Sequence, residues 1–212
     1  RLEVESGKAR YHQHRILQHL ALPIASAHKG NLQALCWEVA VQMASSRWVK
    51  HGYTLGRKPL NDRAKIALAK WYWLIGDLQT GFDLLESPNE DYDGFHVRVE
   101  QIRFALLLGH FDWAKEAAYE LNTYTDLNQF SDVYLMLTLC IECIDFNDPS
   151  PLLETSLQHE WVEIYLGGLH LLAMRKRLRS ENNCDTLEML EWRAKALNHK
   201  LYLALSDPTL YA

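Results

Sequence analysis

The chain has 212 residues, of which 48% are hydrophobic and 23% charged, and its formal net charge is −5. This composition excludes an intrinsically disordered chain, because it offers enough apolar surface to offset the conformational entropy lost on folding. The small negative charge gives no general attraction to nucleic acid or to anionic membranes. No uninterrupted run of about 18 apolar residues occurs in the sequence, so it predicts no membrane-spanning helix.

Helical periodicity begins near the N-terminus. Residues 9–22 place apolar side chains near one face, and Pro23 is expected to kink or restart this helix. Gly30 is expected to end a short second stretch, and Asn31 is placed to cap an amphipathic helix that continues to Met43. The chain starts at Arg1 rather than at Met, which is typical of a processed or excised fragment.

The stretch 50–59 contains two glycines and a proline, and this composition predicts a loop. We place a boundary here, between N-terminal helices over 1–52, which act as a cap or a first repeat, and a helical region over 60–212. The alternative is one continuous domain that belongs to a longer protein.

Two helical hairpins of similar length follow this loop. In the first, Asn61 caps a helix that ends at Gly76, and its partner runs from Leu78 to about residue 86. In the second, helices over 95–108 and 111–121 flank Gly109. The two turn glycines lie 33 positions apart, a period typical of helical-repeat proteins.

The last third of the chain is also helical. The stretch 133–144 is apolar almost all round, which indicates a central position in the stack. Two prolines at 149 and 151 break the chain, and helices are then predicted over about 151–178 and 184–205. The C-terminal helices of the 60–212 region are expected to cap the stack of repeats.

The turn segments 74–82 and 107–117 resemble the hairpin turn of tetratricopeptide repeats. In that family a small residue five positions after the turn glycine lets the two helices approach closely, and Gly81 and Ala114 occupy those places. A weaker resemblance to the same turn occurs at residues 30–35. Ile102 stands where the family has a small residue, and the terminal proline of the unit is absent where expected. The resemblance implies an all-α fold, a right-handed solenoid of antiparallel helix hairpins.

The same resemblance implies a binding groove. In the family the first helix of each hairpin lines the concave surface through positions 2, 5, 9 and 12 of the unit. With units that begin near residues 62 and 95, the predicted partner-binding residues are Arg63, Ile66, Lys70, Trp73, His96, Val99, Arg103 and Leu106. Such a groove would be basic with apolar anchors, and three of its cations would hold a carboxylate or an acidic peptide.

Other motifs that could carry chemistry are better explained by structural roles. Cys140 and Cys143 have redox or zinc spacing, but they lie in mid-helix among apolar residues, which favours core cysteines. The four cysteines fit no disulfide framework, so we expect reduced thiols and a cytoplasmic protein. The basic run 175–179 is expected at a helix C-terminus, where cations meet the negative end of the dipole.

Two further motifs are weaker still as functional sites. His12, His14 and His19 do not share a helix face with a carboxylate, so no metal site is predicted. Gly167 and Gly168 lack the spacing of a phosphate-binding loop, which favours a kink or a close helix contact. The sequence therefore predicts no cofactor and no catalytic set.

These observations favour a non-catalytic interaction module or scaffold that binds a protein or peptide partner, without membrane or nucleic-acid binding. The alternative is a ligand-sensing regulatory domain of a transcription activator that binds a small metabolite. An open groove would favour the peptide partner, whereas a closed cavity lined by convergent polar groups would favour the sensor.

Overall fold

The computed structural model describes residues 26–88, 92–124 and 130–207, and every regular element in these ranges is an α-helix. The predicted all-α class is therefore confirmed. The helices are α2 (Ser26–Met43), α3 (Ser46–Leu55), α4 (Asp62–Leu74), α5 (Leu78–Asp83), α6 (Tyr92–Leu107), α7 (Phe111–Leu121), α8 (Ser131–Ile144), α9 (Ser150–Gln158), α10 (Val162–Leu178), α11 (Cys184–Ala196) and α12 (Lys200–Leu205). The helix expected over 9–22 and the histidines at 12, 14 and 19 lie outside the described residues.

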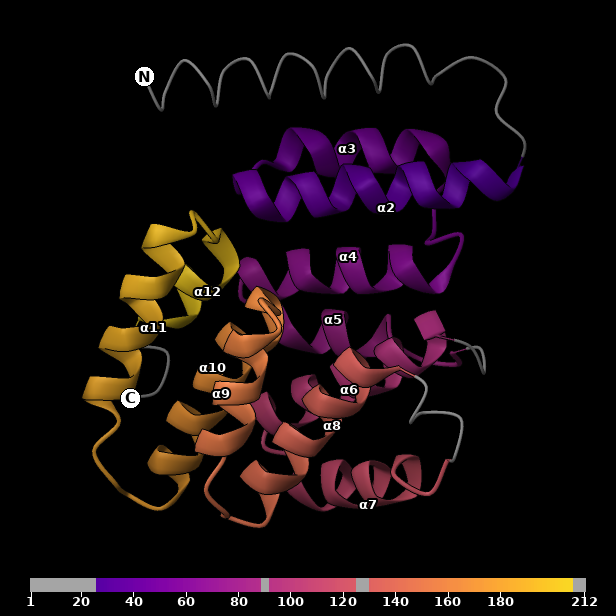
Figure 1. Ribbon diagram of the computed structural model, residues 1–212. Coiled ribbons are helices and arrows are strands. Elements are labelled where there is room, and N and C mark those ends of the chain that lie inside the picture. The colour runs from indigo at the N-terminus through magenta and orange to yellow at the C-terminus, as the bar shows by residue number, and fades with distance from the viewer. Residues whose placement is uncertain (1–25, 89–91, 125–129, 208–212) are drawn as a thin grey trace.

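Most helices form pairs of sequence neighbours, and the first helices of successive pairs contact one another. Within pairs, α2 contacts α3, α4 contacts α5, α6 contacts α7, α8 contacts α9 and α10 contacts α11. Between pairs, α2 contacts α4, α4 contacts α6, α6 contacts α8 and α8 contacts α10, so these five helices form a continuous inner row (Figure 1). Among the described helices, none combines the length and apolar character needed to cross a bilayer.

The inner row curves, and α12 connects its two ends. Helix α12 contacts both α4 and α2, as well as its sequence neighbours α11 and α10 (Figure 1). The C-terminal helices therefore return to the first described hairpins, and α2, α4, α6, α8, α10 and α12 surround a shared interior space.

The two predicted turn glycines are confirmed by the backbone. Gly76 and Gly109 have φ of +83° and +78°, a left-handed conformation that glycine adopts without a Cβ penalty. After α4 the Asp77 amide donates to the Tyr72 carbonyl at 2.9 Å, and after α6 the His110 amide donates to the Ala105 carbonyl at 2.9 Å. These bonds satisfy carbonyls that the helix end leaves open.

Gly81 confirms the expected close approach of helices. It is buried, and a Cβ at this position would lie 2.4 Å from Cε1 of Phe104 and 3.2 Å from the Ala69 carbonyl oxygen. The side chain of Ala114 is also fully buried. Small residues at these two places therefore allow α5 and α7 to pack closely onto the inner row.

The loop predicted over 50–59 is largely wrong, because α3 continues to Leu55. Gly52 lies inside this helix, where a Cβ would come within 2.2 Å of Nε1 of Trp37, so this glycine makes room for an indole rather than a turn. The remaining connection is ordered by the buried Gln33, whose amide donates to the carbonyls of Gly56 and Lys58 and accepts from the Leu60 amide.

Three other predicted helix boundaries are also corrected. Helix α2 passes through Gly30 without ending there. The single helix expected over 151–178 is two helices, α9 and α10, because Glu160 adopts φ of 56° between them. The helix expected over 184–205 is divided in the same way at Asn198, with φ of 52°.

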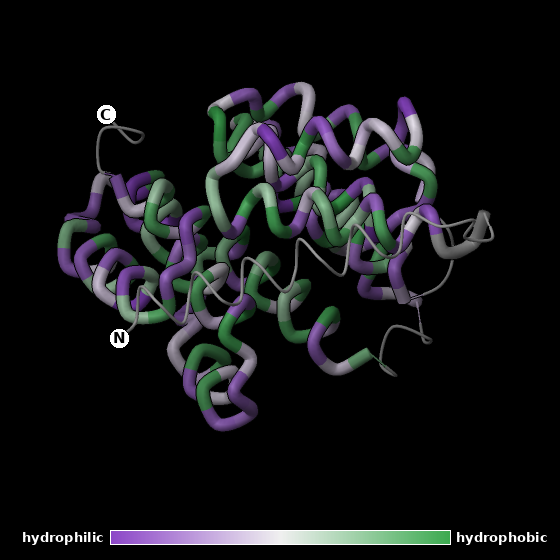
Figure 2. The backbone as a smooth tube through the Cα atoms, turned by 90° about the horizontal axis from the view of Figure 1, so that it is seen from above, coloured by the Kyte–Doolittle hydropathy of each residue, from purple (hydrophilic) through white to green (hydrophobic). Residues whose placement is uncertain are grey.

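Apolar and polar segments alternate along the helices, as amphipathic packing requires (Figure 2). Helices α6 and α10 are the most deeply embedded, because buried residues occupy all sides of both. Gly167 and Gly168 confirm the predicted close contact: a Cβ on the first would lie 2.7 Å from Cε of Met136, and one on the second 2.4 Å from Cδ2 of Leu153. Helix α10 thus packs tightly against α8 and α9.

Candidate functional site

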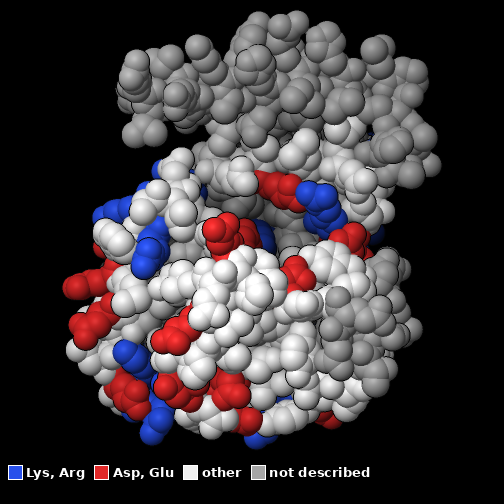
Figure 3. Space-filling view, viewed as in Figure 1, with Lys and Arg blue, Asp and Glu red and all other residues white. Residues whose placement is uncertain are grey.

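The interior space between the inner helices is a cavity of about 520 Å³. Helices α2, α4, α6, α8 and α10 all contribute side chains to it, and His199 completes the wall just before α12. On the face shown in Figure 3 acidic side chains border a hollow, with basic groups beside them. We call it the charged cavity; it is lined by Glu38, Val41, Gln42, Arg63, Ile66, Ala67, Lys70, Tyr92, Asp93, His96, Glu100, Arg103, Asp132, Val133, Met136, Glu163, Ile164 and His199.

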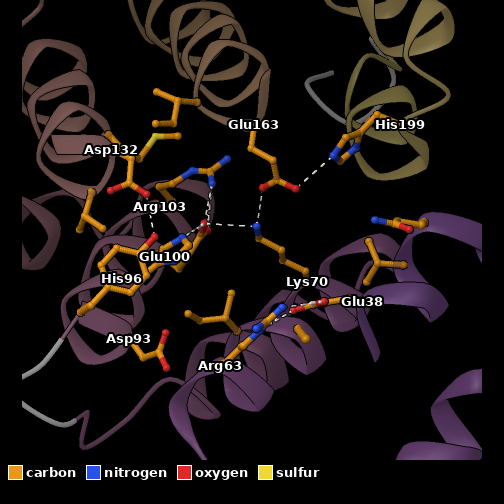
Figure 4. A pocket seen from close by; sticks show the side chains of 18 residues that line it. Glu38, Arg63, Lys70, Asp93, His96, Glu100, Arg103, Asp132, Glu163 and His199 are labelled. Atoms are coloured by element: carbon orange, nitrogen blue, oxygen red, sulfur yellow. Dashed lines mark hydrogen bonds and ion pairs between the residues drawn. The ribbon is translucent and has the colours of Figure 1, made fainter. Parts of the chain in front are cut away.

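A chain of ion pairs crosses the charged cavity from α6 to α12. The Nζ of Lys70 lies 2.6 Å from Oε2 of Glu163 and 3.7 Å from Oε1 of Glu100, and Nε2 of His199 lies 3.2 Å from Oε1 of Glu163 (Figure 4). Lys70 belongs to α4, Glu100 to α6 and Glu163 to α10. These contacts therefore join three inner helices to the returning C-terminal segment.

The deepest part of this network is a buried pair on α6. Nη1 of Arg103 donates to both carboxylate oxygens of Glu100, at 2.9 and 3.0 Å, and Nη2 donates to the Tyr202 hydroxyl at 2.9 Å. Arg103 is 1% exposed and Glu100 is 2% exposed. Gly167 makes room for the pair, because a Cβ there would lie 3.1 Å from Nη2 of Arg103.

The buried groups stay charged because each faces an opposite charge. Burial alone would raise the pKa of Glu100, but Arg103 and Lys70 together hold it well below its usual value. Burial would lower the pKa of Lys70 and Arg103, but their carboxylate neighbours raise the pKa of both. All three groups are therefore ionised at neutral pH.

Glu163 connects the network to α12. Desolvation by the surrounding helices works against its ionisation, but Lys70 and the hydrogen bond from His199 keep its pKa well below the usual value. Its backbone carbonyl also accepts a hydrogen bond from the Tyr202 hydroxyl at 3.3 Å. Its side chain remains half-exposed, so this carboxylate can contact a ligand in the cavity.

The rim of the cavity carries a second set of polar groups. Nε of Arg63 donates to Oε1 of Glu38 at 2.9 Å, which joins α4 to α2. The Tyr92 hydroxyl donates to Oδ2 of Asp132 at 2.7 Å, which joins α6 to α8. Asp93 lies in the first turn of α6, and no cation within 4 Å pairs with it in the described chain.

The predicted partner-binding residues divide into two groups. Arg63, Ile66, Lys70, His96 and Arg103 line the charged cavity.

Trp73, Val99 and Leu106 do not line the charged cavity. Their exposures of 4%, 0% and 2% correct the expectation that they face an open groove. The reason is that α6 is buried on all sides, and that the indole of Trp73 packs edge-on against Phe104 at 4.9 Å between ring centroids.

The expectation of a basic surface is also corrected. Five carboxylates and three Lys or Arg side chains line the cavity, so its formal charge is −2 with both histidines neutral. Arg63, Lys70 and Arg103 each already contact a protein carboxylate. The cavity therefore offers no unpaired Lys or Arg within the described chain to hold an acidic peptide.

Sequence reasoning missed Glu100, Asp132, Glu163 and His199. A signal for the first was present, because Glu100 stands four positions after His96 and three before Arg103, and such spacings bring side chains together on a helix. Nothing local indicated Glu163 or His199: Glu163 meets Lys70, and His199 meets Glu163, only because the fold closes on itself.

A second cavity, of about 370 Å³, lies at the C-terminal ends of α4 and α6. We call it the apolar cavity; it is lined by Trp73, Gly76, Leu78, Leu106, Leu107, Gly109, Phe111, Met174, Arg177, Leu178 and Leu205. It contains both position-12 residues of the predicted repeat units. It offers one charged side chain, Arg177, and therefore little means of orienting a polar ligand.

The cysteine pair has the expected structural role. Cys140 and Cys143 are buried in α8, and burial raises the pKa of both thiols, that of Cys143 to about 12. Cys143 also donates to the Leu171 carbonyl through Sγ at 3.3 Å. A thiol with a raised pKa is a poor nucleophile and a poor metal ligand. Within the described residues, no group of three His, Cys, Asp or Glu side chains is arranged to hold a metal ion.

The basic run 175–179 also lies where it was expected. Arg175, Lys176 and Arg177 occupy the last turn of α10, where positive charge is favourable.

Comparison of the chain with protein-family models, with curated proteins and with solved structures gave no match. The case for a function therefore depends on the geometry of the charged cavity.

Proposed function

We propose that this chain is a tetratricopeptide-like helical solenoid that binds a short peptide segment of a partner protein in its charged cavity, without catalysis. The observation that carries this proposal is the convergence of five inner helices and the α12 segment on one cavity of about 520 Å³. This volume lies within the range of roughly 300–1,000 Å³ that is usual for ligand sites. In tetratricopeptide proteins the first helices of the hairpins line the binding surface. Here the helices of the inner row line the charged cavity, which supports the proposal.

The composition of the wall supports a peptide ligand. Val41, Ile66, Met136 and Ile164 provide apolar surface, while hydroxyl, carboxylate, imidazole and guanidinium groups surround it. A peptide offers matching chemistry, since its backbone needs both donors and acceptors and its side chains need apolar contacts.

The fixed charges support binding rather than acid–base chemistry. A general acid or base works best when its pKa lies near the operating pH. Glu100 and Glu163 have lowered pKa values and Lys70 a raised one, so these three groups keep their charge at neutral pH. Their role is therefore to hold the helices in place and to present a constant electrostatic surface.

A small-metabolite sensor is the second candidate. The observation that favours it is the enclosure of the cavity by helices from both ends of the described chain, because α12 closes against α2 and α4. Polar groups converge there from several directions, as they do in metabolite sites.

Selection of peptides on the immobilised chain tests the proposal. A library of random heptapeptides displayed on phage should yield binders, whose affinity is then measured by isothermal titration calorimetry. Gln42→Trp should weaken binding at least about tenfold, a loss of 1.4 kcal/mol, because this exposed residue lines the cavity and an indole would occupy it.

Gln158→Trp is the matched control, since Gln158 is exposed on α9 and lines neither cavity. It should bind the selected peptides like the parent. If the two variants bind equally well, the peptides do not use the charged cavity. If no peptide is selected but the dialysable fraction of a cell extract raises the melting temperature of the parent and not of Gln42→Trp, the sensor replaces the peptide-binding module.

A further inference from the structure

We infer that the charged cavity selects a peptide with a positively charged side chain, Lys or Arg, which lies at the rim where Asp93 and Asp132 flank Tyr92. This inference depends on the proposed peptide-binding function and specifies its ligand. It is the opposite of the acidic partner that the sequence predicts.

The first support is the imbalance of charge described above, because the carboxylates outnumber the Lys and Arg side chains of the wall. Each of the three cations is already neutralised by a carboxylate of the protein. Asp93 and Asp132 form no ion pair within 4 Å among the described residues, and Arg63, which is paired with Glu38, interacts with Asp93 only over a longer distance. A ligand cation at this rim would therefore gain an attraction to a carboxylate without breaking an ion pair, whereas a ligand anion would have to displace Glu38 from Arg63 or Glu163 from Lys70.

The second support is an aromatic ring between these aspartates. Tyr92 is adjacent to Asp93 in sequence, it is 39% exposed, and its hydroxyl is bound to Asp132. The ring also packs edge-on against His96, with centroids 6.2 Å apart, which restricts its orientation. An exposed tyrosine face beside carboxylates is a favourable surface for an ammonium or guanidinium group.

The third support lies at the floor of the cavity. Nε of Arg103 is buried and has no hydrogen-bond acceptor among the described residues, although both terminal nitrogens of this side chain have partners. A buried donor without an acceptor is uncommon and costly. A peptide carbonyl is a neutral acceptor that would satisfy this donor without disturbing the balance of charge between Arg103 and Glu100.

The test uses acetylated, amidated hexapeptide mixtures in which one position is fixed as Lys, norleucine or Glu and the others are varied. Peptides retained by the immobilised chain are quantified by mass spectrometry. We expect Lys mixtures to be retained several-fold more than norleucine mixtures, because norleucine has a similar chain without the charge, and Glu mixtures to be retained least. The preference for Lys should decline with added salt, which screens exposed charges.

Asp93→Asn/Asp132→Asn should abolish the preference for Lys over norleucine while the chain remains folded. Asp112→Asn/Asp185→Asn is the matched control, because these exposed aspartates also lie in the first turns of helices, α7 and α11, and do not line the cavity. It should keep the parent's preference.

Two different failures are distinguishable. If peptides bind the parent more tightly than Gln42→Trp but show no preference for Lys, the inferred selectivity is wrong and peptide binding stands. If the parent retains no mixture above the level of Gln42→Trp, both proposals are wrong.

Discussion

Helices α4 and α6 contribute to both the charged cavity and the apolar cavity, through positions that are only three residues apart on each helix. Lys70 of α4 and Arg103 of α6 line the first, whereas Trp73 and Leu106 line the second. Three residues are about one helical turn, so the chemistry of the surface changes within one turn of each helix. The first helices thus do not present one uniform groove: their N-terminal parts are charged, and their last turns are apolar.

This difference shows which interactions hold the lining side chains of each cavity in position. In the charged cavity, long side chains are held by ion pairs between helices, and their positions depend on one another. In the apolar cavity, positions depend on contacts between rings and aliphatic groups, such as the pair formed by Trp73 and Phe104. Substitutions in the two regions should therefore lower the unfolding free energy by different amounts, and different second substitutions should restore it.

The largest effect is expected for Arg103→Glu. The change leaves two buried carboxylates side by side and removes the donor to Tyr202, so it should cost about 3–5 kcal/mol of unfolding free energy. Urea unfolding followed by circular dichroism measures this loss. Arg179→Glu is the control, because the pair of Arg179 with Glu181 is exposed and should contribute about 1 kcal/mol or less.

The double variant Glu100→Gln/Arg103→Met tests the origin of that cost. Replacing both partners removes the uncompensated charge, so most of the stability should return. A double variant as unstable as Arg103→Glu would show that the pair itself, rather than an orphaned charge, stabilises the fold.

A smaller loss is expected in the apolar cavity. Leu106→Ala enlarges an existing space and removes buried methyl groups, and should cost about 3 kcal/mol. Leu178→Ala is a matched control in the same cavity, since Leu178 is 44% exposed and loses less contact. If both variants melt at the same temperature, the side chain of Leu106 is not packed as described.

The smallest effect is expected in the pH dependence of stability below neutral pH. The pKa of Glu100 is lowered by folding from its usual value of 4.5, so the unfolded chain takes up this proton first as pH falls. The contribution of Glu100 to stability is therefore present above about pH 4.5 and is lost as pH falls below that value. The free-energy difference between the parent and Glu100→Gln/Arg103→Met should stay constant from pH 7 to about pH 5 and then shift against the parent. A difference that remains constant to pH 3 would contradict the lowered pKa.

The sequence predicted helices well where local signals mark their ends. Asn61 was expected to cap a helix, and its Oδ1 accepts from the Ala64 amide at 2.9 Å. The helix over 111–121 has the predicted bounds. Gly76 and Gly109 were recognisable because glycine is the usual residue in a left-handed helix end.

The same turn also occurs where no glycine marks it. Phe146, Glu160, Ser180 and Asn198 all have φ between 52° and 59°, and each follows a helix end. At Glu160, for example, the next amide, of Trp161, donates to the Ser156 carbonyl at 2.9 Å, the same bond that is formed after Gly76. Residues other than glycine and asparagine rarely adopt this conformation, so composition could not reveal the break at 160, whereas the asparagine at 198 was a signal that the prediction did not use.

The site was predictable only in part for a related reason. The predicted repeat register places Lys70 and Arg103 at position 9 of their units, and both side chains line the charged cavity. Register says nothing about a partner from another part of the chain. Glu163 reaches Lys70, and His199 reaches Glu163, through closure of the fold, and this carboxylate and imidazole change what had been expected to be a basic groove.

That closure also sets the order in which the molecule can be completed during synthesis. Tyr202 binds Arg103 across 99 positions of the chain, and its hydroxyl contacts the Glu163 carbonyl as well. A chain emerging from the ribosome can form its early hairpins from local contacts, but the Arg103 guanidinium must await the last helix. Until then a nascent chain has an unfinished cavity floor, so the proposed binding of a ligand could begin only after the C-terminal helices have been made.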